Sequence, residues 1–443
     1  MNLIYDVEDK PKFGQIIVFA FQQLLAILAA TIAVPMIIGN GMQPAAALFG
    51  AGIGTFVYLL FTKFKSPVFL GSSFAFLGSM GAAFAGAVSM EAGYAGLVIG
   101  AILAGLVYVV IAIIVKFAGV EWINKLMPAQ VIGPTVAIIG LSLAGNAVGD
   151  LQTCDAGGSV YVALICGLVT LLVVCLCSVY GKKMGKLIPF IIGICAGYVL
   201  ALIFTLIGNA SGNDALKVID FSIFEGLKAF SVPEFTFINA FKGIKDVDGS
   251  YFATLLAAYV PVAFVVFAEH IADHKNISSI IGRDLLEKPG LHRTLLGDGV
   301  GSMAGAFFGG CPNTTYGESV ACVAITKNAS VVTIMTTAVL AILISFVGPF
   351  VTFLDSIPAC VMGGVCMSLY GFIAVSGLKM VQKVDLNDNK NLFVVSVILI
   401  AGIGGLVLNF GSVTITGVAT ALILGIIFNL VLGRKKEEVK EEK

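Results

Sequence analysis

The chain is a succession of long apolar segments that short polar segments separate. A transmembrane helix needs about 20 apolar residues to cross a hydrocarbon layer about 30 Å thick. Fourteen segments approach this description, so the pattern predicts an all-α membrane protein with fourteen transmembrane segments. Those near 68–87 and 294–326 are rich in glycine and interrupted. The predicted segments are 15–38, 45–62, 68–87, 95–116, 127–149, 158–180, 186–208, 251–272, 294–309, 311–326, 328–353, 358–378, 391–409 and 414–433.

The distribution of lysine and arginine supports this number of segments, because these residues favour the cytoplasmic side of short loops. If the N-terminus is cytoplasmic, fourteen spans place 22 of the 26 basic residues on that side. The other four, Lys217, Lys228, Lys242 and Lys245, lie in one long external loop. We therefore expect a multi-pass protein of the cell membrane with both termini in the cytoplasm.

Composition excludes several classes of function. Hydrophobic residues make up 58% of the chain and charged residues only 12%, against about 25% charged residues in a soluble domain. The 26 basic and 26 acidic residues balance, which leaves no positive surface for nucleic acid. The nine cysteines have no paired spacing, so we expect small buried side chains and no disulfides or zinc ligands. The expected surroundings are a lipid bilayer.

The two halves of the chain repeat each other. Residues 128–133 (PAQVIG) recur as 358–363 (PACVMG), and 71–76 (GSSFAF) match 313–318 (NTTYGE) in their order of polar, aromatic and small side chains. Each half holds seven predicted spans. Because seven is odd, the second half enters the membrane upside down, which is the inverted repeat of many secondary transporters.

The two interrupted segments occupy equivalent places in this repeat and are candidates for the binding site. Pro312 lacks an N–H and follows two glycines, so extended chain is expected there, with a half-helix that begins near Tyr316. The matching stretch should lead into a half-helix that begins near Phe74. Broken helices at membrane depth mark cavities, since their free backbone groups need partners. The alternative is that these are packing glycines in ordinary tilted helices.

Ionisable side chains inside predicted spans are costly and are therefore functional candidates. Glu269 and Asp273 are four residues apart and share one helix face. His270 and His274 are also four residues apart and share the adjacent face. The histidines and Asp273 resemble a metal site, but we favour an interfacial or supporting role for the imidazoles. For the glutamates the alternative role is a polar clamp between helices. The candidates are Glu269, His270, Asp273, His274, Asp298 and Glu318.

Several motifs together resemble one transporter family. These are residues 312–318 (PNTTYGE) with 324–327 (AITK), 268–271 (AEHI), 71–76 (GSSFAF) and the loop 284–293 (DLLEKPGLHR). The chain is similar in these motifs to the nucleobase-ascorbate transporter family, also called nucleobase:cation symporters, and within it to the uracil permease branch. The resemblance covers residues 14–432.

The resemblance implies a division into a core domain and a gate domain, with the substrate between them. The core domain would comprise 14–119 (spans 1 to 4) and 251–354 (spans 8 to 11), and the gate domain 120–208 (spans 5 to 7) and 355–433 (spans 12 to 14). An external loop at 209–250 and a charged cytoplasmic tail at 434–443 complete the expected organisation. Spans 3 and 10 would be the broken ones, with short extended stretches.

The resemblance also implies the site. Glu269 and Glu318 would hold the base; Ala30, Phe74, Tyr316, Gly317, Ser319 and Tyr370 would surround it, Tyr370 from the gate. Two positions depart from the uracil-type pattern. Asp273 stands where uracil-type relatives have His, and Ser319 stands where the family motif usually has Asn. Uracil is the preferred substrate, and a xanthine- or urate-type purine is the alternative.

Transport by this family implies coupling to an ion. Burial favours the neutral form of a carboxyl group, so Glu269, Asp273 or Glu318 would carry a proton, with sodium as the rival ion. We expect no enzyme activity, no cofactor, no resident metal, and a homodimer. An anion exchanger of seven-plus-seven design and an intramembrane metal-dependent hydrolase built on His270, Asp273 and His274 are the alternatives from other classes.

The charge distribution generates a prediction about topology. Single cysteines at positions 182, 183 and 434, in place of Lys182, Lys183 and Arg434, should react only with reagents supplied from the cytoplasmic side. Cysteines at positions within 212–245 should react from outside. External labelling at position 183 would contradict the fourteen-span topology.

Overall fold

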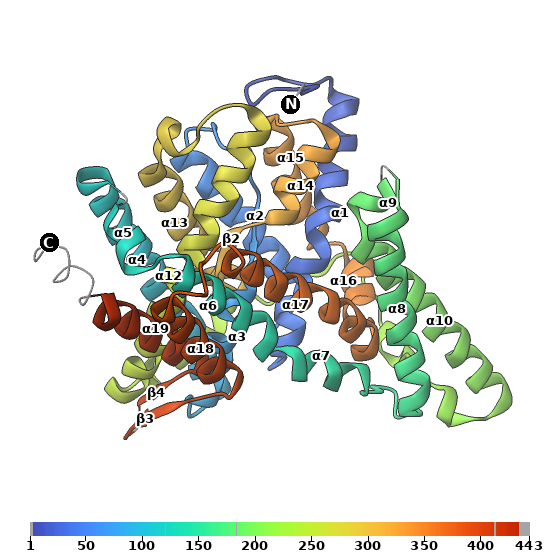
Figure 1. The fold of residues 1–443 in the computed structure, drawn as a ribbon. Helices are drawn as coiled ribbons and strands as arrows, with labels where there is room; N and C mark the ends of the chain where they lie inside the picture. Colours follow the sequence, from blue (N-terminus) through green and yellow to red (C-terminus); the bar gives the residue numbers. More distant parts are fainter. Residues whose placement is uncertain (1–2, 120, 183, 412, 434–443) are drawn as a thin grey trace, which may run out of the picture.

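The computed structural model describes residues 3–433 apart from 120, 183 and 412. Lys183, Arg434 and the tail 434–443, which the topology prediction uses, lie outside the described residues. The described chain is predominantly helical (Figure 1). Within it, eight helical segments are long and apolar enough to cross a membrane by length and composition. They are α1 (Phe13–Ile38), α2 (Pro44–Phe61), α4 (Met90–Ala118), α6 with α7 (Ala129–Leu151), α8 (Val160–Tyr180), α10 (Pro189–Ser211), α12 (Gly249–Ile281) and α17 (Ala359–Val381).

Shorter helices occupy the remaining predicted segments. Each of the fourteen segments contains helix, and the number of membrane spans itself stays a prediction. The shorter apolar helices are η1 with α3 (Phe74–Ala85), α14 (Gly317–Thr326), α15 (Val331–Ile344), α18 (Asn389–Ile403) and α19 (Gly417–Gly433). Helix α13 (Leu291–Gly309) carries Arg293 and Asp298. Connecting helices are α5 (Glu121–Leu126), α9 (Met184–Leu187), α11 (Thr236–Gly243) and α16 (Gly348–Asp355).

Some predicted boundaries are wrong. The segment 127–149 corresponds to the candidate span Ala129–Leu151, which consists of α6 (Ala129–Ser142) and α7 (Ala144–Leu151), whereas 328–353 is divided into α15 and α16. Helix α12 continues past the predicted end at 272 to Ile281 and ends at Gly282, whose φ is 70°. Polar residues such as Lys275 are compatible with a helix, whereas a left-handed glycine ends one.

Two extended segments cross inside the molecule and pair with each other. Strand β1 (Leu70–Ser72) pairs with β2 (Asn313–Thr315) in antiparallel register, Leu70 opposite Thr315 and Ser72 opposite Asn313. The pairing continues on both sides, because the N–H of Ser73 donates to the Pro312 carbonyl at 2.9 Å and that of Tyr316 to the Phe69 carbonyl at 3.2 Å. All residues of both strands are buried. Each strand therefore satisfies backbone groups that the other needs.

A helix follows each strand. After β1, a short 3-10 turn begins at Phe74 and leads into α3 (Leu77–Ala85). After β2, α14 begins at Gly317. These starts agree with the positions expected near Phe74 and Tyr316. Whether the two strand-helix units are broken membrane spans stays a prediction. A separate β-hairpin, β3 (Leu408–Phe410) with β4 (Val413–Ile415), joins α18 to α19.

The long helices form two groups (Figure 1). In the first helix group, which comprises α1 to α4 and α12 to α15, α13 packs against both α2 and α4. In the second helix group, which comprises α6 to α8, α10 and α17 to α19, α17 packs against α6 and α8. Between the groups, α12 contacts α19 and β4, and α1 contacts α10.

Glycines allow the closest approach within the first helix group. A Cβ added to Gly54 of α2 would lie 2.7 Å from the carbonyl oxygen of Gly301 in α13. Asn313 of β2 enters this contact and donates its side-chain N–H to the Gly50 carbonyl at 3.3 Å. The close packing of α2 and α13 therefore also holds β2 in place.

Candidate functional site

A cavity of about 590 Å³ lies between the two helix groups. The first group supplies one face of α12, the start of η1 and the junction of β2 with α14, and the second group supplies α6, α17 and the start of α10. Most of the lining is apolar, and the polar groups come mainly from the first group. The lining includes Ser73, Phe74, Ile132, Val136, Lys186, Phe190, Ala268, Glu269, Ala272, Asp273, Thr314, Tyr316, Gly317, Glu318, Phe372 and Ser376.

Three carboxylates line this cavity. Glu269 and Asp273 lie one turn apart on α12, and Glu318 lies in the first turn of α14. The Glu269 side chain is exposed to the cavity, while Asp273 and Glu318 are half-buried. The Thr315 hydroxyl donates to Oδ2 of Asp273 at 2.8 Å. The structure thus brings together the three residues that the sequence proposed for proton coupling.

The start of α14 adds hydrogen-bond donors beside these carboxylates. Tyr316 is the N-cap and has no side-chain cap bond, and Tyr316, Gly317 and Glu318 all line the cavity. The first N–H groups of a helix have no partner within the helix and carry a partial positive charge. The site therefore combines carboxylate acceptors with backbone donors at one wall.

Two aromatic residues are held in place near this wall. The Tyr316 hydroxyl donates to the Ser72 carbonyl at 2.7 Å, so its ring lies across the β1–β2 pair. A side chain at Gly71 would collide with that ring. Phe74 is half-buried and meets the ring of Tyr370 from α17 edge-on, with centroids 6.2 Å apart. Phe74 thus connects the cavity wall of one group to a helix of the other.

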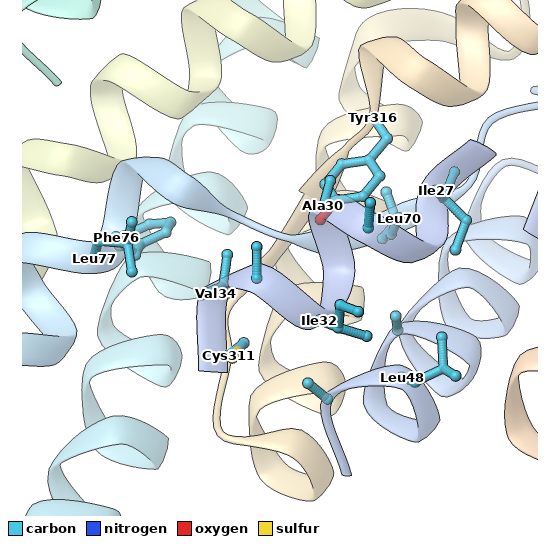
Figure 2. Packing of buried hydrophobic residues seen from close by; sticks show 14 of the residues in the cluster. Ile27, Ala30, Ile32, Val34, Leu48, Leu70, Phe76, Leu77, Cys311 and Tyr316 are labelled. Atoms are coloured by element: carbon cyan, nitrogen blue, oxygen red, sulfur yellow. The ribbon is translucent and has the colours of Figure 1, made fainter. Parts of the chain in front are cut away.

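Three residues expected around the substrate do not line the cavity. Ala30 is buried in a cluster of apolar side chains that also contains Tyr316 (Figure 2). Tyr370 is buried and contacts the ring of Phe74. Ser319 is fully buried; its Oγ accepts a hydrogen bond from Nε2 of Gln23 at 2.5 Å and another from the Phe69 N–H at 3.0 Å. Ser319 thus joins α1, α14 and the segment before β1.

Sequence reasoning missed Lys186 and Thr315. Lys186 of α9 lines the cavity and brings a positive charge to it, although in the sequence it is one of many basic residues of a predicted cytoplasmic loop. Thr315 holds Asp273, but in the sequence it is only one of two hydroxyl residues in a motif. No sequence pattern marks either contact, because both join segments far apart in the chain.

The histidines of α12, for which an interfacial or supporting role is expected, are buried inside the protein, which favours the supporting role. His270 and His274 are both 0% exposed. They lie on the face of α12 that meets α13 and α2, away from the cavity, where His270 contacts Asp298 and Thr294 and His274 contacts Tyr58. In the described part of the chain, no three His, Cys, Asp or Glu side chains are grouped so as to hold a metal ion.

Comparison with known proteins decides the family. The Permease family (Xan_ur_permease) matches residues 14–411. The chain belongs to this permease family. Within it, the chain is 41% identical to the uracil permease of Bacillus caldolyticus over 97% of its own length and 94% of that protein. It is 38% identical to the uracil permease of Bacillus subtilis (strain 168), over 98% of its length and 96% of that protein. The permease is thus a member of the uracil permease branch of the nucleobase-ascorbate transporters and a multi-pass membrane protein.

Solved structures of more distant proteins share the fold. The transmembrane domain of the cyanobacterial bicarbonate transporter BicA matches 96% of this permease and 100% of that chain, with a TM-score of 0.63 and 14% identity. The murine anion transporter Slc26a9, in its inward-facing state, matches 97% of this permease and 70% of that chain, with a TM-score of 0.67 and 12% identity. At this identity the likeness concerns the fold alone.

The contacts of Ser319 generate a prediction that separates a structural role from substrate binding. Ser319→Ala removes the acceptor of two buried donors, Gln23 and the Phe69 N–H, so the permease should lose about 1–3 kcal/mol of stability. A lower melting temperature of the purified protein in detergent would show this loss. Ser396→Ala is the control, because its exposed hydroxyl bonds only to its own helix at the Leu392 carbonyl. An unchanged melting temperature together with weaker substrate binding would instead make Ser319 a substrate contact.

Proposed function

We propose that this permease is a secondary active transporter that imports a nucleobase, with uracil as the preferred substrate, by proton symport. The observation that carries the proposal is the cavity between the two helix groups, where Glu269 and Glu318 lie beside the first turn of α14. The similarity to uracil permeases of two Bacillus species supports the choice of substrate. Permeases move solutes without chemical conversion, so no enzyme activity and no cofactor are proposed.

The polar groups of the cavity match the edge of a pyrimidine base. Uracil has ring N–H donors and carbonyl acceptors. Ionised Glu318 only accepts hydrogen bonds, and a protonated Glu269 still offers its carbonyl oxygen as an acceptor, so both suit the ring N–H groups. The N–H groups at the start of α14 suit the carbonyl oxygens. Phe74, which lines the cavity, offers an apolar surface to the ring. A ligand lacking one of these groups would leave a buried donor or acceptor unpaired, which costs about 1–3 kcal/mol.

A xanthine- or urate-type purine is the second candidate substrate. The observation that favours it is Asp273, a third carboxylate on the cavity wall, whose Oδ2 is already bonded to Thr315. A purine has additional N–H groups that a further carboxylate can accept. An anion is a weaker candidate although the fold resembles an anion transporter, because three carboxylates at the site would repel it and Lys186 alone would offset only part of that charge.

The proposed architecture is fourteen spans in an inverted repeat of seven plus seven. The strand register supports it. The sequence repeat relates Gly71 to Asn313 and Ser72 to Thr314. A two-fold axis that relates the two repeats would exchange Gly71 with Asn313 and Thr314 with Ser72. The pair Gly71–Thr314 would then become the pair Asn313–Ser72, and both pairs occur in the observed register. Antiparallel pairing of equivalent segments is expected when the axis lies in the membrane plane.

Alternating access would occur by movement of one helix group relative to the other. In this proposal the first helix group belongs to the core domain (14–119 and 251–354) and the second to the gate domain (120–208 and 355–433). Glu269, Asp273, Glu318 and Phe74 all belong to the first group. A base bound to them would travel with that group while the apolar surfaces of α6 and α17 exclude water on one side at a time. Cytoplasmic termini and a homodimer belong to the same proposal.

Replacement of Glu318 tests recognition. Glu318→Gln keeps the shape of the side chain but replaces an oxygen acceptor with an N–H donor, which would face a donor of the pyrimidine. Binding of uracil to the purified protein, measured by calorimetry, should weaken about 10- to 100-fold, as expected for the loss of about 1.4–3 kcal/mol. Glu287→Gln, in an exposed loop, is the control. Unchanged uracil affinity in Glu318→Gln would show that Glu318 does not contact the base.

Replacement of Glu269 tests coupling. If Glu269 carries the proton, uracil uptake should rise as external pH falls, stop when a protonophore is added, and be insensitive to sodium. Glu269→Gln should abolish accumulation in proteoliposomes while exchange of bound uracil persists, because an amide cannot release a proton. Asp273→Asn provides the comparison: loss of proton dependence in that variant alone would make Asp273 the carrier. Accumulation driven by a sodium gradient at equal pH, and absent with a proton gradient, would refute proton symport.

A further inference from the structure

A buried polar network lies on the side of α12 that faces away from the cavity. It joins α12 to α13 and α2 through His270 and His274, whose rings stack with centroids 4.0 Å apart and an angle of 27° between their planes. Both imidazoles are fully buried, and neither lines the cavity. The mechanism proposed above uses neither of them. The two buried histidines therefore have a role other than contact with the substrate.

Both ring nitrogens of His270 are bonded to α13. Nδ1 lies 2.7 Å from Oδ2 of Asp298, and Nε2 lies 3.0 Å from Oγ1 of Thr294. Among the described residues, the second oxygen of Asp298 has no hydrogen-bond partner, although the side chain is only 1% exposed. The carboxyl group of Asp298 therefore depends on His270 for its hydrogen bond.

The neighbouring contacts fix the direction of these bonds. Oγ1 of Thr294 donates to the Leu291 carbonyl at 3.1 Å, so its lone pair accepts from Nε2–H of His270. One further proton lies between Nδ1 of His270 and Asp298. Nδ1 of His274 must donate, because its partner at 2.8 Å is the carbonyl oxygen of His270. Its Nε2 lies 2.7 Å from the Tyr58 hydroxyl, which donates its proton to Oγ of Ser66 at 2.6 Å. Each imidazole is thus held in one orientation.

This attachment determines how α12 is turned about its own axis. Successive residues of an α-helix are about 100° apart around the axis, so a fixed His270 sets the direction of Glu269, its neighbour, and of Asp273 one turn later. A helix with its side chains has a radius of about 5–6 Å. A rotation of about 20° would therefore displace the imidazole by about 2 Å and break both bonds to α13, while it turned the carboxylates away from the cavity.

We propose that His270 is a positioning residue of the transport site: its hydrogen bond to Asp298 of α13, with the bond to Thr294 in a secondary role, fixes the rotation of α12 and directs Glu269 and Asp273 into the cavity. The role in transport rests on the proposed function. The role of His270 in orienting α12 is independent of the proposed function and can be measured without a substrate.

Two amide substitutions separate the two bonds of His270. In His270→Asn the amide nitrogen takes the place of Nδ1 and keeps the bond to Asp298. In His270→Gln the amide reaches the place of Nε2, so the bond to Thr294 persists and Asp298 loses its partner. A hydrogen bond to a charged group contributes about 1.5–3 kcal/mol, so uracil affinity should fall about 10- to 100-fold in His270→Gln. It should stay close to the parent value in His270→Asn. His292→Gln, at the half-exposed histidine of α13, is the matched control and should bind as the parent does.

The orientation of α12 can be measured as the rate at which a thiol reagent labels a cysteine substituted for Ala272. Ala272 is exposed on the cavity-facing side of α12. The exposed Cys175 and Cys195 are replaced by Ser in this background. A charged thiol reagent should label this cysteine at the parent rate with His270→Asn and about tenfold more slowly with His270→Gln, because loss of the bond to Asp298 lets α12 rotate and turns position 272 away from the cavity. If His270→Gln does not fold, Asp298→Leu, which removes the partner of Nδ1 and leaves the bond to Thr294, should slow labelling in the same direction.

The outcomes are distinguishable. Equal labelling rates in the parent, His270→Asn and His270→Gln would overturn the positioning role, whatever happens to binding. Equal losses in the Asn and Gln variants would also overturn it, since the bond to Asp298 would then be irrelevant. A parent protein that binds no uracil, together with the predicted order of labelling rates, would overturn the proposed function and leave the positioning role supported.

Discussion

The structure depends on one constraint: extended backbone inside an apolar molecule must find hydrogen-bond partners within the protein. β1 and β2 satisfy this requirement for each other through the register from Leu70 and Thr315 to Ser72 and Asn313. An unpaired backbone group in such surroundings costs several kcal/mol, so neither strand is expected to persist without the other. The pairing places the two following helix starts, at Phe74 and Gly317, at the same wall of the cavity. The location of the site follows from backbone pairing before any side chain is considered.

The side chains around the strands then stabilise that arrangement. Tyr316 lies across the pair with its hydroxyl on Ser72, and Ser319 links the start of α14 to α1 and to Phe69. Helix α12 contributes on two sides: Glu269 and Asp273 face the cavity, and His270 is bonded to α13. Because a packed helix moves as a rigid body, a rotation of α12 that disturbs the buried network also displaces Glu269 and Asp273 in the cavity wall. The second helix group adds mostly apolar surface to the cavity.

The likeness to BicA and Slc26a9 shows how far this fold can serve different solutes. Those proteins share the fold at 14% and 12% identity, and their names describe transport of bicarbonate and of anions. In this permease, three carboxylates lie beside the start of α14. The polarity of a helix start favours negative charge, and the carboxylates offset that preference and add acceptors for N–H groups. Function on a shared fold is decided by such side chains, as is general for widely used folds.

The amino-acid sequence by itself determined the helical membrane architecture, the two helix starts near Phe74 and Tyr316, and the common face of Glu269 and Asp273. These features depend on local quantities: runs of apolar residues, glycine and proline at chain breaks, and the helical repeat. Only the tertiary structure decided that Ser319 bonds to Gln23 and Phe69, that Lys186 reaches the cavity, that Tyr370 contacts the ring of Phe74, and that His270 and His274 are buried against α13 and α2. The reason is that helical periodicity tells which residues share a face, whereas the partner of that face is set by packing between segments hundreds of residues apart.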